Sequence, residues 1–344
     1  MKAIQVTGYG GLEKLSLVDV PRPIPKEGQV LVEVKACGIN NTVIRMREGA
    51  YGVKEASGWK KEGVSFPRIP GSDVAGKIIS LGEGVDSSRL GEDVVLFPFT
   101  SLAKEGEEHY AEDLAFLGSE YDGGYAEYVV WPAALCFPMP LKTYEESAVF
   151  SVSGLTAWHM IEQLKLQKGQ SVVVTGANGG VGSMNVQIAA KVFGATVVAL
   201  VGDLKRAEAM KYLGATHVLS YRSEDLEEEI LAALGGSCDA VLDVVGDALF
   251  TKMIAVLKNG GKFCISGSIG GQKTEVDLRA LYLKHITLYG SVLGTREEYQ
   301  KMLQAISFGQ VLPVLDKVFP LAEAAKAQSY FKEQGKMGKI LLRP

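Results

Sequence analysis

The chain has 344 residues, 47% of them hydrophobic, and a formal net charge of −4 at pH 7. This size and composition predict two domains with hydrophobic cores of their own, and the absence of a basic block argues against a nucleic-acid partner. No apolar run reaches the roughly 18 residues of a membrane span. The four cysteines are scattered and form no CxxC pair, so we expect no disulfides. The first segment lacks the apolar core of a signal peptide, so we expect a cytoplasmic protein.

The first 95 or so residues contain short apolar segments separated by glycine and proline, such as KAIQV, LSLVDV and QVLVEVKACG. Frequent turns and β-branched runs without long helices between them predict a closed or partly closed β-structure. A helical pattern then appears between Ser147 and Leu164, with apolar residues on one face.

The clearest motif lies between residues 171 and 195. The β-branched run Val172 to Val174 is typical of a strand buried on both faces, and an apolar helical pattern begins a few residues later. Glycines let the backbone turn tightly and approach a ligand, and the N-terminus of a helix attracts a pyrophosphate. Strand, glycine turn and helix in this order predict a dinucleotide site. Four glycines fall within seven residues here: Gly176, Gly179, Gly180 and Gly182.

Strand and helix patterns alternate from Val172 to Val292, which predicts a doubly wound parallel sheet with its ligand at the carboxyl ends of the strands. The last segments, including VLPVLDKVFPL and GKILLRP, are β-like again, so we expect the C-terminus to return to the first domain. The expected fold class is α/β. Its expected domains are a β-rich one at residues 1–125 and 295–344 and a dinucleotide-binding one at residues 126–294.

The chain resembles the medium-chain dehydrogenase/reductase superfamily over essentially its whole length, and within it the zinc-independent quinone oxidoreductase branch. The segments that carry the likeness are VKACGINNTVIRMREGAY (34–51), FPRIPGSDVAGKIISLGEGV (66–85), DGGYAEYVV (122–130), SGLTAWHMI (153–161), VLSYRSEDL (218–226) and GSVLGTREEY (290–299). The resemblance implies a GroES-like catalytic domain, a Rossmann cofactor domain, a cleft between them, hydride transfer with a nicotinamide, and a homodimer or homotetramer.

The zinc ligands of metal-dependent relatives are missing from the matching positions, which hold Asn40, Ser72 and Asp73. A catalytic zinc needs about three protein ligands of nitrogen, sulfur or carboxylate type. The segment 97–118, which matches the structural-zinc lobe, has no cysteine. We therefore predict no metal. Cys37 is expected to be a small buried hydrophobe and His159 a packed helix residue, rather than ligands.

Without a Lewis acid, reduction of a simple ketone loses transition-state stabilisation, whereas quinones and enones are conjugated acceptors that need it less. The sequence therefore favours an NADP(H)-dependent oxidoreductase that reduces quinones or α,β-unsaturated carbonyls. By resemblance, Asn40, Thr42 and Tyr51 face the substrate, and Tyr51 either donates a proton or only shapes the cleft. Val43 stands where relatives often carry Asp, which puts any mechanism that needs that carboxylate in doubt.

The resemblance also implies the cofactor contacts. At the end of the second Rossmann strand, Gly202 is followed by Lys205 and Arg206, cations that suit a 2′-phosphate and favour NADP(H). The alternative is that Asp203 binds the ribose of NAD. By resemblance, Tyr221 lies against the adenosine, Gly267, Ser268 and the Leu293–Gly294 segment line the nicotinamide side, and Lys336 lies near the phosphates. The full expected set is Thr156, Gly176, Asn178, Gly179, Gly180, Val181, Gly182, Gly202, Lys205, Arg206, Tyr221, Gly267, Ser268, Leu293, Gly294 and Lys336.

Two other functions remain open at this point. One is an alcohol dehydrogenase or ketone reductase of the same superfamily, favoured by the GSVLGT segment and the long former zinc lobe. The other is a weakly catalytic NADPH-binding protein, favoured by the loss of the carboxylate at Val43.

Overall fold

The computed structural model describes residues 1–50, 64–333 and 335–344, and these form two compact units. The first unit comprises residues 1–152 and 313–344, and the second comprises residues 153–312. Each unit has a central sheet of its own, and each is described below by itself.

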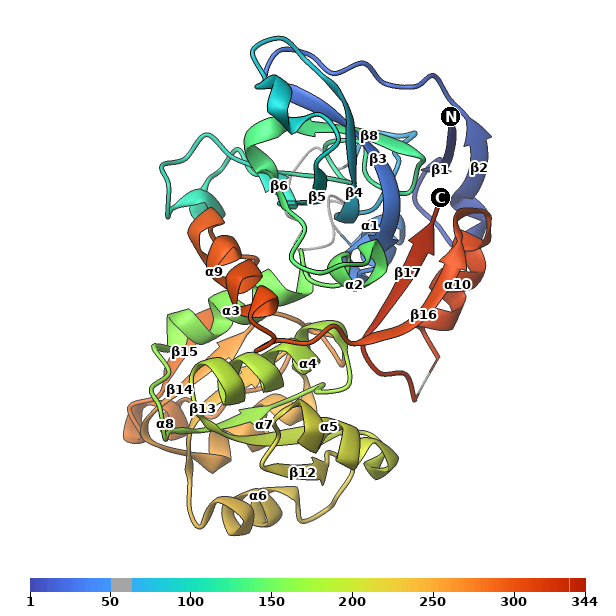
Figure 1. Ribbon diagram of the computed structural model, residues 1–344. Helices are drawn as coiled ribbons and strands as arrows, with labels where there is room; N and C mark the ends of the chain where they lie inside the picture. The colour runs from blue at the N-terminus through green and yellow to red at the C-terminus, as the bar shows by residue number, and fades with distance from the viewer. Residues whose placement is uncertain (51–63, 334) are drawn as a thin grey trace. The chain divides into compact units, whose positions relative to one another are not determined.

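The first unit is built on a seven-stranded sheet with β3 (Gln29–Gly38) at its centre (Figure 1). The strand order is β16-β17-β3-β4-β5-β9, and β8 also pairs with β3. Seven of the ten residues of β3 are buried and are apolar or glycine, whereas the charged Glu33 and Lys35 are half-buried. Its end meets two other strands: Gly38 pairs with Asp73 of β4 and with Leu341 of β17. The C-terminal strand thus returns to the N-terminal sheet, as the sequence predicts.

The strands of the first unit are β1 (Lys2–Val6), β2 (Leu15–Asp19), β3, β4 (Asp73–Leu81), β5 (Asp93–Leu96), β6 (Phe99–Thr100), β7 (Ala115–Phe116), β8 (Tyr128–Pro132), β9 (Cys136–Pro138), β16 (Leu315–Pro320) and β17 (Lys339–Arg343). Its α-helices are α1 (Asn41–Arg47), α2 (Tyr144–Ser147) and α10 (Ala324–Phe331). Short helical turns are η1 (Leu12–Lys14), η2 (Ser87–Arg89), η3 (Glu108–Tyr110), η4 (Ala133–Leu135) and η7 (Leu321–Glu323).

The second unit is a six-stranded parallel sheet in the order β12-β11-β10-β13-β14-β15. The chain runs outward from β10 to β12 and then crosses back to β13, so β10 and β13 are the neighbours at which the strand order reverses. Helices α3, α4, α5 and α9 contact one another in one layer, and α6, α7 and α8 form another (Figure 1). Apolar residues such as Val173, Val241 and Phe263 pack against α6 and α7 in the core.

The strands of the second unit are β10 (Ser171–Val174), β11 (Thr196–Val201), β12 (His217–Ser220), β13 (Cys238–Asp243), β14 (Leu257–Ile265) and β15 (Thr287–Gly290). Its helices are α3 (Ser153–Leu164), α4 (Gly180–Gln187), α5 (Ala207–Leu213), α6 (Leu226–Leu234), α7 (Ala248–Val256), α8 (Leu278–Leu283) and α9 (Arg296–Ser307), with the turns η5 (Ile188–Val192) and η6 (Leu204–Arg206). Among the described residues, no helix combines the length and the apolar character needed to cross a membrane.

The fold class expected from the sequence is confirmed, but the unit bounds differ from the expected domain bounds of 125/126 and 294/295. Residues 126–152 stay with the first unit because β8 pairs with β3 and β9 pairs with β5. Helix α9 stays with the second unit because it packs on α3. These assignments depend on pairing and packing between segments that are distant in the sequence.

Candidate functional site

The glycine turn follows β10 directly and leads into α4. Gly176 has a φ of +58°, and Gly179 is the N-cap of the helix. A Cβ added to Gly182 would lie 2.1 Å from the carbonyl oxygen of Gly176, so only glycine lets the first turn of α4 pack against the strand end. The close packing aims the N-terminal N–H groups of α4 at the carboxyl edge of the sheet.

One polar atom in this turn fits a bound ligand. Within the part of the chain that the structure describes, Asn178 Oδ1 is buried and has no hydrogen-bond donor. Such an atom is costly unless a ligand or water satisfies it. Together with the helix N-terminus, it makes the turn suitable for the phosphates of a dinucleotide. Gly180 and Val181 contribute the first residues of that helix.

A buried carboxylate ties together the two strands at which the sheet order reverses. Asp243, at the end of β13, accepts hydrogen bonds from Thr175 Oγ1 at 2.5 Å, from the Val245 amide at 2.9 Å and from the Gly246 amide at 3.0 Å. Burial raises the pKa of Asp243, and these hydrogen bonds oppose the rise. Asp243 thereby holds the loop after β13 in one shape.

The nicotinamide-side residues expected from the sequence lie against this loop. A Cβ at Gly267 would come within 2.7 Å of the Val244 carbonyl oxygen, and one at Gly246 would lie 3.6 Å from Ser268 Cα. Gly267 and Ser268 follow β14, the neighbour of β13, so their position at the same sheet edge is as expected.

Leu293, Gly294 and Thr156 form a second group next to the sheet. Leu293 is buried with a φ of +50°, and Gly294 packs so closely on α3 that a Cβ would meet Leu155 at 2.9 Å. Thr156 is the buried neighbour of Leu155 on that helix. His159, also on α3, is buried, and its Nδ1 lies 2.9 Å from Glu298 Oε1, which confirms a packed helix position.

The end of β11 holds the residues expected at the adenosine. Gly202 leaves room for Tyr221, whose hydroxyl oxygen would lie 2.9 Å from a Cβ at that position. Asp203 accepts a hydrogen bond from the Lys205 amide at 3.0 Å and so caps η6. Lys205 and Arg206 are exposed on that turn.

A buried polar cluster in the first unit brings together the ends of three adjacent strands. We call Asn40, Asp73 and Lys339 the Asn–Asp–Lys cluster; their exposed fractions are 7%, 0% and 2%. Lys339 Nζ donates to Asn40 Oδ1 at 2.6 Å and to Asp73 Oδ2 at 2.5 Å. Asn40 Nδ2 donates to the same Asp73 Oδ2 at 2.9 Å. The other carboxylate oxygen accepts from the Val152 amide at 2.6 Å.

The local sequence makes room for this cluster. A Cβ at Gly38 would lie 2.7 Å from Asp73 Oδ2, so glycine at the end of β3 admits the carboxylate. Asn40 is the N-cap of α1, yet its side chain makes no capping hydrogen bond. Its amide is used in the cluster instead. Burial and the nearby Asp73 carboxylate raise the pKa of the Cys37 thiol well above its usual range, in keeping with a buried, protonated cysteine.

The cluster does not fit a zinc ion. It offers one carboxylate and one amide oxygen where about three good ligands are needed, and a positively charged ammonium already binds both oxygens. Ser72 donates its hydroxyl to the Leu117 carbonyl at 2.6 Å. Across residues 1–50, 64–333 and 335–344, no group of three or more His, Cys, Asp or Glu side chains is placed to hold a metal.

Two further predicted residues, Thr42 and Lys336, belong to the first unit. Thr42 is exposed in the first turn of α1, two residues beyond Asn40. Lys336 is half-buried, and its Nζ donates to the carbonyl of Glu333. Tyr51 lies outside the described residues, so its catalytic role stays a prediction.

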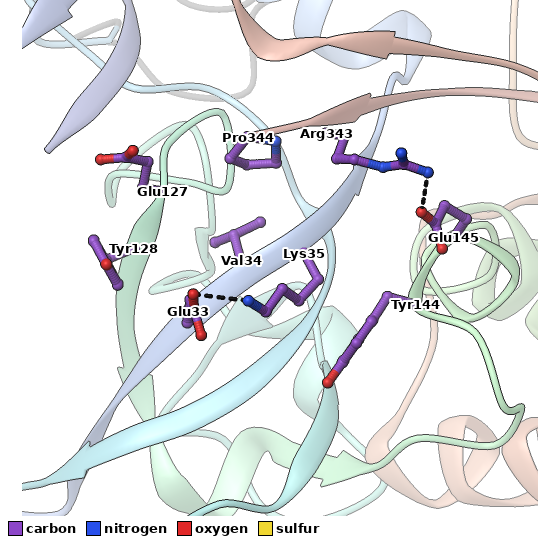
Figure 2. Close-up of a pocket in the computed structure, with 9 residues that line it drawn as sticks. All are labelled: Glu33, Val34, Lys35, Glu127, Tyr128, Tyr144, Glu145, Arg343 and Pro344. Carbon is purple, nitrogen blue, oxygen red and sulfur yellow. Dashed lines mark hydrogen bonds and ion pairs between the residues drawn. The ribbon is translucent and has the colours of Figure 1, made fainter.

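A surface pocket of about 290 Å³ on the first unit is distinct from these groups (Figure 2). Four of its charged side chains form pairs: Lys35 Nζ lies 2.7 Å from Glu33 Oε1, and Arg343 pairs with Glu145. None of the residues predicted to bind cofactor or substrate lines it.

Sequence reasoning missed Thr175, Asp243 and Lys339. Asp243 ends an apolar strand, and a carboxylate at the carboxyl edge of a parallel sheet could have been predicted as a site residue from the sequence. Lys339 gave no usable signal, because a lysine at the start of a strand usually extends into solvent.

Comparison with known proteins gives one family match in each of the two units. Residues 26–141 match the family described as alcohol dehydrogenase GroES-like domain, and residues 180–307 match zinc-binding dehydrogenase. The chain is 31% identical to the quinone oxidoreductase of Rattus norvegicus, with 99% of this chain and 97% of the relative covered. It is 29% identical to an NAD-dependent alcohol dehydrogenase of Sulfurisphaera tokodaii, with both chains fully covered. A crystal structure of a putative alcohol dehydrogenase from Sinorhizobium meliloti superposes with a TM-score of 0.95 at 38% identity and covers 100% of this chain and 96% of that one.

These matches, together with the dinucleotide turn, define a nicotinamide-dependent oxidoreductase. The chain belongs to the medium-chain dehydrogenase/reductase superfamily.

Proposed function

We propose that this enzyme reduces quinones or α,β-unsaturated carbonyls with NADPH and without a metal. The observation that carries the proposal is the Lys339 ammonium, which binds the Asn40 and Asp73 oxygens at the position where metal-dependent relatives are expected to place a catalytic ion. Without a metal to polarise a carbonyl, a conjugated acceptor is the substrate class that the remaining groups can serve.

In this proposal, the bound nicotinamide supplies the hydride. The chain's own residues hold the cofactor and stabilise the charge that develops on the acceptor oxygen. Asn40 donates a hydrogen bond to that oxygen, because its amide keeps a second hydrogen beyond the one given to Asp73. Thr42 and Tyr51 are proposed as further polar contacts, with Tyr51 or water returning the proton.

NADPH is proposed over NADH because of the turn after β11. Asp203 is engaged in capping the Lys205 amide, and Gly202 places no carboxylate at the strand end. Lys205 and Arg206 then provide positive charge for a 2′-phosphate. The remaining predicted contacts, including Lys336 at the phosphates, are proposed in the roles given above.

The second candidate is an alcohol dehydrogenase or ketone reductase. It is favoured by the similarity to the NAD-dependent alcohol dehydrogenase of Sulfurisphaera tokodaii and to the putative alcohol dehydrogenase of Sinorhizobium meliloti. In this alternative, Asn40 polarises a simple carbonyl, and NADH is the cofactor.

We also propose that the enzyme is a homodimer that pairs through β15. This strand ends the six-stranded sheet of the second unit, and Leu288 on it is 44% exposed. Leu278, Tyr282 and Leu283 on the preceding helix α8 are also exposed. An apolar edge strand is a template for pairing with a second copy. Sedimentation should give twice the 36.9 kDa chain mass; a monomer would contradict this pairing.

The proposed reaction is tested by oxidation of NADPH and NADH with metal-stripped enzyme, followed by the absorbance of the reduced nicotinamide. A quinone, an enone and a simple ketone are compared side by side. We expect NADPH oxidation with the two conjugated acceptors and no gain when zinc is added. Activity only with the ketone, or only after zinc is restored, would make the alcohol dehydrogenase alternative the better one.

A further inference from the structure

The Asn–Asp–Lys cluster departs from two general rules. Asn at an N-cap normally accepts a backbone N–H. Asp225 and Asp247 do not make such a bond at their own helices, whereas Thr143 and Thr295 do. Asn40 does not. A fully buried ion pair also adds little net stability relative to apolar residues of the same size. Local rules broken together at one place are expected where a function needs the arrangement.

The charges on either side determine the orientation of the Asn40 amide. An ammonium can only donate, so the atom 2.6 Å from Lys339 Nζ must be the amide oxygen. An ionised carboxylate can only accept, so the atom 2.9 Å from Asp73 Oδ2 must be the amide nitrogen. A rotated amide would bring oxygen to carboxylate and nitrogen to ammonium, and both contacts would be repulsive. The amide therefore has a single orientation.

Asp73 is in turn fixed by the fold. Its carboxylate is fully buried and receives the Val152 amide on one oxygen and both cluster donors on the other. Lys339 begins β17, and its own amide donates to the Val314 carbonyl at 2.8 Å. Both charged groups thus come from the first residue of a strand that is paired with β3. Asn40 has slight exposure, so it is the member through which the cluster can reach a ligand.

We propose that Asp73 and Lys339 are positioning residues for Asn40. They hold its amide so that the second Nδ2 hydrogen points to the acceptor oxygen of the substrate. The ammonium at Oδ1 also polarises the amide and strengthens this donor. The inference deepens the proposed function and rests on it for the identity of the acceptor, but the locking of the amide does not depend on which acceptor is reduced.

The test uses the full-length double variant Asp73→Asn/Lys339→Met, which removes both charges and leaves the net charge unchanged. With 1,4-naphthoquinone, we expect kcat to fall about 10-fold to 100-fold, as for a lost supporting partner, with the KM for the acceptor and the affinity for NADPH little changed. Lys262→Met is the matched control. Its ammonium donates to the Leu164 carbonyl in the second unit, and kcat should stay at the wild-type value.

A second measurement does not depend on turnover. In protein with isotope-labelled asparagine, the Asn40 side-chain signal is identified by its loss in Asn40→Ala. Its exchange with solvent should be about tenfold or more faster in the double variant, because bonds to charged partners are replaced by weaker ones. Wild-type kcat in a double variant that binds NADPH normally, or unchanged Asn40 exchange, would overturn the inference. If the wild-type enzyme reduces only ketones, the proposed function is wrong, and the same kcat ratio measured with a ketone still decides this inference.

Discussion

Replacing Gly182 with alanine is expected to cost roughly 1–3 kcal/mol through overpacking, which lowers the free energy of unfolding by that amount and the affinity for the nicotinamide cofactor by about 5-fold to 150-fold. The added Cβ would lie 2.1 Å from the Gly176 carbonyl oxygen, 2.7 Å from its carbon and 2.8 Å from Ala177 Cα. All three are backbone atoms, which cannot rotate away as a side chain can. The first turn of α4 must therefore move off β10 and carry its N–H groups away from the phosphates. A fluorescence titration with NADPH measures the change.

The matched control is Gly179→Ala in the same turn. A Cβ at that position would meet one atom, the Gly176 carbonyl oxygen at 3.4 Å, and the φ of −78° suits alanine. We expect its free energy of unfolding to stay within about 0.5 kcal/mol of wild type. Comparison of the two variants therefore distinguishes an effect of helix packing from an effect of direct contact with the cofactor. Equal destabilisation by both would show that the Gly176–Gly182 contact is not what requires glycine.

Replacing Lys339 with methionine is expected to lower the free energy of unfolding by about 3–5 kcal/mol, the usual cost of breaking a buried ion pair. The methionine side chain nearly fills the volume of lysine, so the loss comes from charge and not from a cavity. It leaves the Asp73 carboxylate with no exposure and no counter-ion. Urea unfolding at neutral pH measures the effect.

The double variant Asp73→Asn/Lys339→Met should recover most of that loss, because it removes the unpaired charge as well. If Asp73 and Lys339 position Asn40, the double variant should be more stable than Lys339→Met but should keep a kcat below that of the wild type. If Lys339→Met were as stable as wild type, the buried pair described above would be wrong.

Local pattern in the sequence predicted much of the second unit. The run from Val172 to Gly182 has β-branched residues, then glycines, then a helical period, and each signal depends only on neighbours in the chain. The structure has β10, the turn and α4 in that order. Helix α8 was not predicted. Its six residues, LRALYL, are too few to show a helical period.

Long-range pairing explains what local pattern missed. Both expected domain bounds lie N-terminal to the bounds of the compact units. The pairing of β8 with β3 and the packing of α9 on α3 set the observed bounds, and neither can be predicted from the local sequence of these segments. The resemblance led us to expect Asn40 at the substrate, but nothing in the neighbouring sequence indicates its bonds to Asp73 and Lys339. Lys339 itself reads as a solvated lysine.

The sequence by itself determined the superfamily, the α/β class and the dinucleotide turn, because these follow from residue spacing and from motifs that are continuous in the chain. Only the tertiary structure decided that the Asn–Asp–Lys cluster forms. Asn40, Asp73 and Lys339 are separated by 33 and 266 residues, and they meet because β4 and β17 both pair with the end of β3. Strand pairing over such distances is set by the burial of whole sheets, and no local pattern encodes it.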